Sequence, residues 1–284
     1  MDLDKMNPLP IFLKYARYRY IAYRIFLRMK IGKKKRDEYI KKSGIKSIDF
    51  LPKRAYTING IKVIPRKHTE DFHMFQIPRE KELIPHLLMN EGETFVDVGA
   101  NVGYYSLRIA KKYQNEAVKV IAIEAHPENF NALCDNIRCN NLTTINTINK
   151  AASDHRGVET IYESVDNRNR VRSDSYSLSD GFLSSSTGSS VVRSEGKHLR
   201  IQCDTLDNIL GRNKVDVMKI DVEGAEVLAL RRATNTLKML RKIIVEVHGN
   251  NQDKIKNILN NIHRLKVETL ETPIMNYVIG SKVA

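Results

Sequence analysis

The sequence predicts an α/β protein with a seven-stranded, mostly parallel sheet that ends in an antiparallel hairpin. Three observations predict this fold class: short apolar strand patterns alternate with helical patterns, a glycine-rich turn joins one strand to a helix, and two strands end in acidic residues. Alternating strands and helices normally fold into a parallel sheet covered by helices. With 284 residues, 42% hydrophobic and 28% charged, the chain can form one large core, which excludes wholesale disorder.

The individual elements follow from the same pattern. Seven strands are expected at residues 94–98, 118–124, 144–149, 215–221, 243–248, 267–272 and 276–282. The helices between them are expected at 104–113, 127–139, 223–240 and 251–265. Strands in this order, closed by a hairpin, fit a Rossmann-like sheet.

The chain divides into three predicted parts. Residues 1–54 form a basic arm, residues 55–92 a β-hairpin and a short helix, and residues 93–284 the main domain. The hairpin is expected to turn at Asn59–Gly60, because this dipeptide favours tight hairpin turns, and the helix at 78–90. Within the main domain, the Ser-rich residues 163–196 predict a loop, either a lid or a tolerated insertion, before a strand at 199–203.

The positive charge of the chain is concentrated in the arm. The formal net charge is +14, of which residues 1–54 carry +11, from 16 Lys or Arg and 5 Asp or Glu. The arm predicts an amphipathic helix that has many tyrosines and one basic edge, formed by Lys14, Arg17, Arg24 and Arg28. Three interpretations stay open: a helix packed on the main domain, a helix on an anionic membrane surface, or a nucleic-acid contact.

Other composition features bear on the compartment and on metals. Charges interrupt every apolar stretch of the arm, so it predicts neither a transmembrane segment nor a signal peptide. Three cysteines are too few for a disulfide framework, which favours a cytoplasmic protein, with a peripheral position at the cytoplasmic membrane face if the arm binds lipid. Cys134 and Cys139 lack paired partners at zinc spacing, so the sequence predicts no metal site.

A glycine loop follows the first predicted strand. Asp97 is followed by Gly99, Asn101 and Gly103, so the strand runs directly into a helix. Gly99 would permit a sharp turn, and Gly103 would let the helix start lie close to a ligand. The acid before the glycines favours a cationic cofactor over a pyrophosphate, and S-adenosylmethionine carries both an ammonium and a sulfonium. Asp97 could instead be a structural residue of an ordinary turn.

Acidic residues also end other predicted strands. Glu124 ends the second strand, where a carboxylate can accept hydrogen bonds from both ribose hydroxyls of a nucleotide. Asp221 ends the fourth strand, Glu223 follows it, and His248 ends the fifth. Asp221 could be a helix cap, Glu223 a first-turn stabiliser and His248 structural. Alternatively, one of the three accepts a proton in catalysis.

Taken together, these segments resemble the FkbM family of S-adenosylmethionine-dependent methyltransferases. The matching segments are residues 97–103, 124–129, 205–207 and 219–226, together with Glu246. The resemblance covers residues 75–250, excludes the arm, and implies a class I methyltransferase fold with S-adenosylmethionine as cofactor. Mapped onto this chain, it implies cofactor contacts from Asp97, Gly99, Asn101, Gly103, Glu124, His126, Ala152, Ser153 and Asp221.

The expected reaction is methylation of a hydroxyl group on a sugar, glycan, glycolipid or related small molecule. Catalysis would come mainly from alignment of the acceptor hydroxyl, with Asp221, Glu223 or His248 as candidate bases. Two alternatives remain: an RNA methyltransferase that uses the basic arm, and a non-catalytic protein on a membrane surface. The sequence carries no prediction of the oligomeric state.

Overall fold

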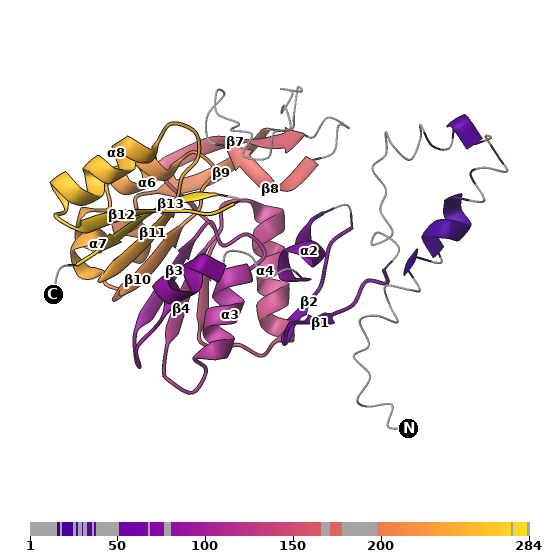
Figure 1. Ribbon diagram of the computed structural model, residues 1–284, viewed down its shortest axis with the longest axis horizontal. Coiled ribbons are helices and arrows are strands. Elements are labelled where there is room, and N and C mark those ends of the chain that lie inside the picture. The colour runs from indigo at the N-terminus through magenta and orange to yellow at the C-terminus, as the bar shows by residue number, and fades with distance from the viewer. Residues whose placement is uncertain are drawn as a thin grey trace.

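A computed structural model describes most of the chain outside the arm. The described residues are 16–17, 19–24, 27, 30, 33–35, 37, 51–67, 69–76, 81–165, 171–177, 198–273 and 275–282. They form a two-stranded, a four-stranded and a seven-stranded sheet, with helices on both faces of the last (Figure 1). Most of the predicted arm and most of residues 163–196 lie outside the described residues.

The seven-stranded sheet is the predicted one and confirms the fold class. Its strand order is β12-β13-β11-β10-β3-β4-β5, in which β13 pairs antiparallel with both β11 and β12 and the other pairs are parallel. The strands are β3 Thr94–Val98, β4 Lys119–Ile123, β5 Ile145–Ile148, β10 Val217–Ile220, β11 Lys242–Glu246, β12 Lys266–Glu271 and β13 Asn276–Ser281. β3 and β10 are buried at every position, as central strands covered on both faces must be.

Helices cover both faces of this sheet. α3 (Tyr104–Lys112) packs against alternate core residues such as Phe95 and Val217. On the other face, α6, α7 and α8 contribute to a second core around residues such as Val96 and Met218. The helices are α3 Tyr104–Lys112, α4 Pro127–Cys139, α5 Leu206–Leu210, α6 Glu226–Arg231, α7 Thr234–Met239, α8 Gln252–Asn257 and the π-helical turn η4 Ile258–Ile262.

Two predicted helices are divided in the structure. The helix expected at 223–240 starts only at Glu226, because Glu223 and Gly224 have φ angles of 49° and 100°, outside the helical region. It is then divided at Arg232–Ala233 into α6 and α7. The helix expected at 251–265 is α8 continued by η4. Helical periodicity alone did not reveal either interruption.

Between β5 and β10 the chain forms a separate four-stranded sheet, which the sequence did not predict. Its order is β6-β9-β7-β8, formed by β6 Ala151–Ala152, β7 Gly157–Val165, β8 Val171–Ser177 and β9 His198–Asp204. The predicted strand at 199–203 is confirmed, but the loop predicted at 163–196 is wrong where β7 and β8 occupy it. β7 pairs with β9 from Gly157 to Tyr162, and β8 extends this ladder. Pairing with distant strands outweighs the low strand propensity of the local Ser and Asp residues.

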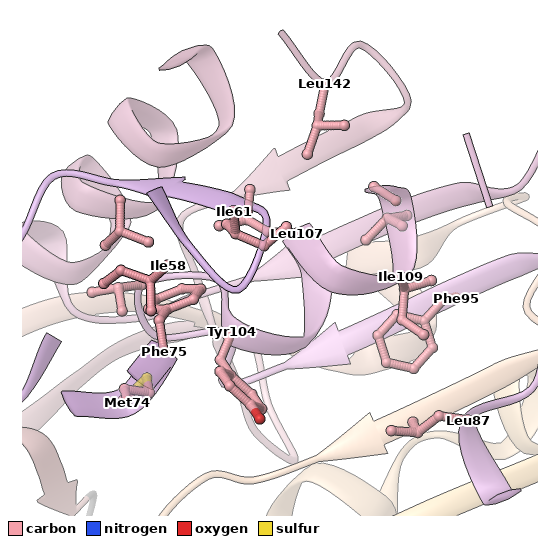
Figure 2. Packing of buried hydrophobic residues seen from close by; sticks show 14 of the residues in the cluster. Ile58, Ile61, Met74, Phe75, Leu87, Phe95, Tyr104, Leu107, Ile109 and Leu142 are labelled. Carbon is pink, nitrogen blue, oxygen red and sulfur yellow. The ribbon is translucent and has the colours of Figure 1, made fainter. Parts of the chain in front are cut away.

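The N-terminal hairpin packs onto the main domain. β1 (Tyr56–Ile58) and β2 (Ile61–Val63) pair antiparallel and turn at Asn59–Gly60, which confirms the predicted hairpin. Figure 2 shows Ile58 and Ile61 beside Phe75, Tyr104 and Leu107. The unpredicted helix α2 (Asp71–Gln76) supplies Phe75. Within the helix expected at 78–90, the structure forms the 3-10 helix η3 (Lys81–Leu87).

The described arm residues are mostly helical. Arg24 contacts Asp37 at 3.3 Å and stacks over the ring of Tyr20 at 5.7 Å. Among the described residues, no helix is long and apolar enough to cross a membrane. The complete basic edge expected for the arm includes residues outside the described part, such as Lys14 and Arg28.

Candidate active site

A pocket opens at the carboxyl ends of β3, β4 and β10, the edge where ligands bind in parallel sheets. Its empty volume is about 630 Å³ including the solvent-open mouth. Six of the predicted site residues line it: Gly99, Asn101, Glu124, Ala152, Asp221 and Glu223. The other five, Asp97, Gly103, His126, Ser153 and His248, are not in the lining.

Gly99 is needed for close contact between two strand ends. Its φ is +82°, and a Cβ atom at this position would lie 1.8 Å from the backbone oxygen of Asp221. The N–H groups of Gly99 and Ala100 both donate to Ile123 O at 2.9 Å. These amides are engaged within the protein, so Gly99 contributes close backbone approach to the pocket rather than a free donor.

Gly103 serves helix packing instead of the ligand approach suggested by the sequence. It has φ +95° at the start of α3, and an added Cβ would lie 2.7 Å from Leu133 Cδ1 of α4. The physical reason for this glycine is therefore the close packing of α3 and α4.

Glu124 presents a fixed carboxylate at the pocket wall. Asn101 N–H donates to Oε2 at 2.7 Å and His126 N–H donates to Oε1 at 2.8 Å, and the residue is only 2% exposed. The backbone thus holds the carboxylate before any ligand arrives. The ring of His126 accepts from Glu128 N–H at 3.2 Å and caps α4, so this histidine positions the loop around Glu124.

Asp97 is buried beneath the pocket. Its Oδ2 accepts from Ser106 Oγ at 2.5 Å and from Ser106 N–H at 3.1 Å, near the start of α3. Burial raises the pKa of Asp97, although the charge of Lys219 and the Ser106 hydrogen bonds oppose the shift. One oxygen of this carboxylate is therefore hydrogen-bonded to α3, and Asp97 is outside the pocket lining; the contact with a cationic cofactor group expected from the sequence stays a prediction.

Of the two predicted cofactor contacts after β5, Ala152 lines the pocket and Ser153 is buried outside it. Ala152 lines the pocket from β6. Ser153 is fully buried, and its N–H donates to Asp204 O at 2.9 Å, so it ties this segment to β9.

A cluster of charged side chains lies beside the pocket at the ends of β10 and β11. Lys219 Nζ is 2.9 Å from Asp221 Oδ2 and 3.6 Å from Glu246 Oε2, and it lies 4.6 Å from the ring centre of Tyr105. Burial disfavours the charged form of Asp221, yet Lys219 and His248 lower its pKa overall. Asp221 is therefore held as a carboxylate, and Lys219 fixes its position.

His248 lies within 4 Å of four carboxylates. Its Nδ1 is 2.8 Å from Glu226 Oε1, and its Nε2 is 3.5 Å from Glu223, 3.7 Å from Glu246 and 4.0 Å from Asp221. Burial alone would lower the pKa of this imidazole, but the Glu226 hydrogen bond and the nearby carboxylates raise it to about 10. A group that is already protonated near pH 7 cannot accept a proton, which speaks against His248 as the catalytic base.

From the sequence, Glu226 had no predicted catalytic or binding role. In the structure it is fully buried and accepts from Gly224 N–H at 2.7 Å and from Asn251 Nδ2 at 3.0 Å, besides contacting His248. Its position depends on where α6 begins, which no local pattern revealed. Glu246 was detectable from the sequence, because it lies at the carboxyl end of a predicted strand, at the same sheet edge as Asp221.

Fold and site together define the class. A parallel sheet in this order, closed by an antiparallel hairpin and carrying a buried acid at the end of β4, is the arrangement of the Rossmann-like class I methyltransferases. Residues 97–269 match the sequence profile of the Methyltransferase FkbM domain, which is more than half of the chain. The chain therefore belongs to the FkbM methyltransferase family, and this confirms the predicted family and its cofactor, S-adenosylmethionine.

Individual relatives are more distant. A Methanocaldococcus jannaschii tRNA(Phe) (4-demethylwyosine(37)-C(7)) aminocarboxypropyltransferase is 36% identical over 72 residues, or 25% of this chain and 27% of that protein. The FkbM methyltransferase of Methylobacillus flagellatus KT is 18% identical with a TM-score of 0.48, over 69% of this chain and 45% of that one. The precorrin-6y C5,15-methyltransferase of Geobacter metallireducens GS-15 is 11% identical with a TM-score of 0.45, over 81% and 100%. The chain thus spans less than half the length of the first two relatives.

Proposed function

We propose that the protein is an S-adenosylmethionine-dependent O-methyltransferase that acts on a hydroxyl group of a sugar, glycan, glycolipid or related small molecule. The observation that carries this proposal is the set of three carboxylates at one pocket: Glu124 on one side, and Asp221 and Glu223 on the other. Glu124 is placed to accept hydrogen bonds from a ribose diol, and Asp221 and Glu223 are placed to contact an acceptor hydroxyl. Family membership supports the methyl-transfer part of the proposal.

The cofactor fits the pocket by its chemistry. Bound S-adenosylmethionine supplies an electrophilic methyl group. Glu124 lines the pocket, where a carboxylate can accept hydrogen bonds from ribose hydroxyls, and backbone hydrogen bonds from Asn101 and His126 hold it in place. Ala152 offers an apolar surface next to the adenine position inferred from the resemblance.

Asp221 and Glu223 act on the acceptor. Both line the pocket, and Lys219 holds Asp221 in place at 2.9 Å. One of these carboxylates would accept the hydroxyl proton while the methyl group passes from the sulfonium sulfur to the oxygen and S-adenosylhomocysteine leaves. Alignment of the acceptor would supply most of the rate enhancement.

A second function is favoured by one specific observation. The curated relative at 36% identity acts on tRNA(Phe), by its name, and the arm of this chain carries a net charge of +11. Methylation of RNA is therefore the alternative acceptor class. The main domain without the arm carries only +3, which supports the small-molecule acceptor.

Location and division of the chain complete the proposal. We place the protein in the cytoplasm, with residues 1–54 as an arm that binds the anionic face of the membrane, 55–92 as a connecting unit and 93–284 as the methyltransferase domain. The basic, tyrosine-containing helix supports the membrane contact. A purely non-catalytic membrane protein is disfavoured by the pre-positioned Glu124 and Asp221.

A labelling experiment tests the acceptor class. The full chain is incubated with methyl-labelled S-adenosylmethionine and cell extract, which is then separated into lipid, glycan, small-molecule and RNA fractions. Label in the lipid, glycan or small-molecule fraction supports the main proposal, whereas label confined to RNA overturns it in favour of the alternative. Glu124→Ala serves as the control with weakened cofactor binding.

A further inference from the structure

The carboxyl ends of β10 and β11 bring a second set of ligand-type atoms together. One oxygen each from Asp221 and Glu223 and one ring nitrogen of His248 lie within 4.8 Å of one another. Ligands of a single divalent ion at ~2.1 Å are separated by at most ~4.2 Å, so small side-chain movements bring all three into one coordination sphere. The same three residues are predicted from the sequence as candidate bases but not as metal ligands, because their distances from one another depend on the tertiary structure.

His248 provides an independent observation. Its Nε2 atom is buried and has no hydrogen-bond partner among the described residues, although it points toward the carboxylates of Asp221 and Glu223. The side chain is only 4% exposed, so bulk water is not available to satisfy this atom. A buried ring nitrogen left in this way calls for a partner from outside the chain, such as an ion or an ordered water.

The other ring nitrogen has the partner expected of a metal-binding histidine. Nδ1 lies 2.8 Å from Glu226 Oε1, and Glu226 is itself fixed by Gly224 N–H and Asn251 Nδ2. In metal sites, a carboxylate that accepts the Nδ1 proton orients the ring and leaves the Nε2 lone pair for the ion. Glu226 is fully buried, so this orientation is rigid.

The charge balance also favours a cation. Asp221, Glu223, Glu246 and Glu226 surround His248, while Lys219 offsets part of their charge through Asp221 and Glu246. A proton or a divalent ion at Nε2 would compensate for the remainder. These two occupants compete for the same atom, so binding of the ion would release the Nε2 proton.

We propose that Asp221, Glu223 and His248 form a binding site for one divalent cation of the Mn²⁺ or Mg²⁺ class, with Glu226 as the positioning residue. Two carboxylates favour hard ions and the imidazole adds affinity for Mn²⁺. Because Asp221 and Glu223 line the pocket, the ion lies at its wall. Its role rests on the proposed function: it orients the acceptor hydroxyl and makes it more acidic.

Metal binding is measured directly on the full chain without cofactor or acceptor. Titration with Mn²⁺, followed by electron paramagnetic resonance, should show one site per chain and a nitrogen coupling from an imidazole ligand. His248→Gln should remove this coupling and weaken binding about 10–100-fold or more. Glu226→Gln should weaken binding about 10-fold or more while the nitrogen coupling is retained at saturating Mn²⁺.

Two further variants keep the result decisive. Glu223→Gln alters a side chain that is 32% exposed, so it tests the site without the folding risk of a buried substitution, and it should also weaken Mn²⁺ binding about 10-fold or more. His155→Ala is the matched control, because His155, Glu159 and Cys203 form another cluster of ligand-type atoms away from the charged cluster. It should leave Mn²⁺ binding unchanged.

The outcomes separate this inference from the proposed function. No saturable Mn²⁺ binding, unchanged binding in both His248→Gln and Glu223→Gln, or loss of binding in His155→Ala overturns the metal site, even if hydroxyl methylation is observed. One-site binding that depends on His248 and Glu223 supports the metal site, even if no hydroxyl acceptor is labelled.

Discussion

Glu124 is the residue whose role depends most directly on its hydrogen bonds. Both of its oxygens accept backbone N–H groups, from Asn101 and His126, so its position at the pocket is fixed. Glu124→Ala removes the acceptor for the ribose hydroxyls and leaves both N–H groups unpaired. We expect S-adenosylmethionine affinity to fall by about 10–100-fold, the equivalent of ~1.5–3 kcal/mol for hydrogen bonds to a charged group.

Isothermal titration calorimetry measures this change. His126→Ala is the control, because it removes the α4 cap and should lower stability by ~1 kcal/mol with a smaller effect on cofactor affinity. Unchanged affinity in Glu124→Ala would remove this residue from the cofactor site.

Asp221 is expected to affect turnover more than cofactor binding. Asp221→Asn keeps the shape of the side chain but removes the charge that Lys219 holds at 2.9 Å. We expect kcat to fall by about 100-fold with a much smaller change in cofactor affinity, since general-base steps contribute on this order. Single-turnover kinetics on the labelled acceptor measure the effect, and wild-type activity in this variant contradicts a catalytic role.

At the scale of elements, two glycines control how the strand ends and helices meet. Gly99→Ala would place a Cβ 1.8 Å from a backbone oxygen at the end of β10, whereas Gly103→Ala would meet side-chain atoms, Leu133 Cδ1 at 2.7 Å and Leu107 at 3.2 Å. Both glycines have positive φ, so an alanine is strained at either position. The clash at Gly99 is harder to relieve, because it involves a backbone oxygen, whereas a side chain can move. We expect Gly99→Ala to lower the free energy of unfolding by ~3 kcal/mol or more, and Gly103→Ala by less.

Urea unfolding of the two variants measures this difference. The double variant Gly103→Ala/Leu133→Ala tests the cause at Gly103, because removing the Leu133 methyl groups relieves the clash. Equal destabilisation by the two single variants would contradict the structural assignment.

An ion pair joins the chain just before β3 to the chain just before β11. Arg241 donates from Nε and from a terminal nitrogen to both oxygens of Glu93, at 2.6 and 2.7 Å. Burial alone would raise the pKa of Glu93, but hydrogen bonds from Arg241 and Asn90 lower it from 4.5 to about 2. The folded state therefore favours the carboxylate more than the unfolded state does.

The sign of the pH dependence follows. Stability from this pair is fully present above pH 4.5 and is lost as the pH falls toward about 2. We expect Glu93→Gln to be less stable than wild type at pH 7, with the gap narrowing between pH 4.5 and 2. Urea unfolding across this pH range measures the gap, and a constant difference would contradict the lowered pKa.

At the scale of the whole molecule, the uneven charge predicts a separate function for the arm. Residues 1–54 carry +11 of the net +14, so deletion of the arm should abolish binding to vesicles containing anionic lipid and leave the fold of the main domain intact. Vesicle co-sedimentation and circular dichroism measure the two effects. Neutral vesicles are the control, and an arm deletion that loses RNA binding but keeps vesicle binding supports the RNA alternative.

The main sheet and the edge where its pocket opens were predictable from the sequence. Short apolar runs at regular spacing predict buried strands from the local sequence alone. Acids at the carboxyl ends of neighbouring parallel strands lie at the same edge of the sheet. The four-stranded sheet was not predictable, because β7 pairs with β9, about 40 residues away along the chain, and β8 joins the sheet only through β7.

By itself the sequence determined the fold class, the family resemblance and the candidate acids Glu124, Asp221 and Glu223, since each depends on short-range pattern. Only the tertiary structure decided that Asp97 is bonded to Ser106, that Gly103 serves helix packing, and that His248 is oriented by Glu226 among carboxylates. The physical reason is that the hydrogen-bond partners and charged neighbours of a side chain come from segments that are distant in the sequence and lie close together only in the folded chain. A local sequence pattern does not identify these segments.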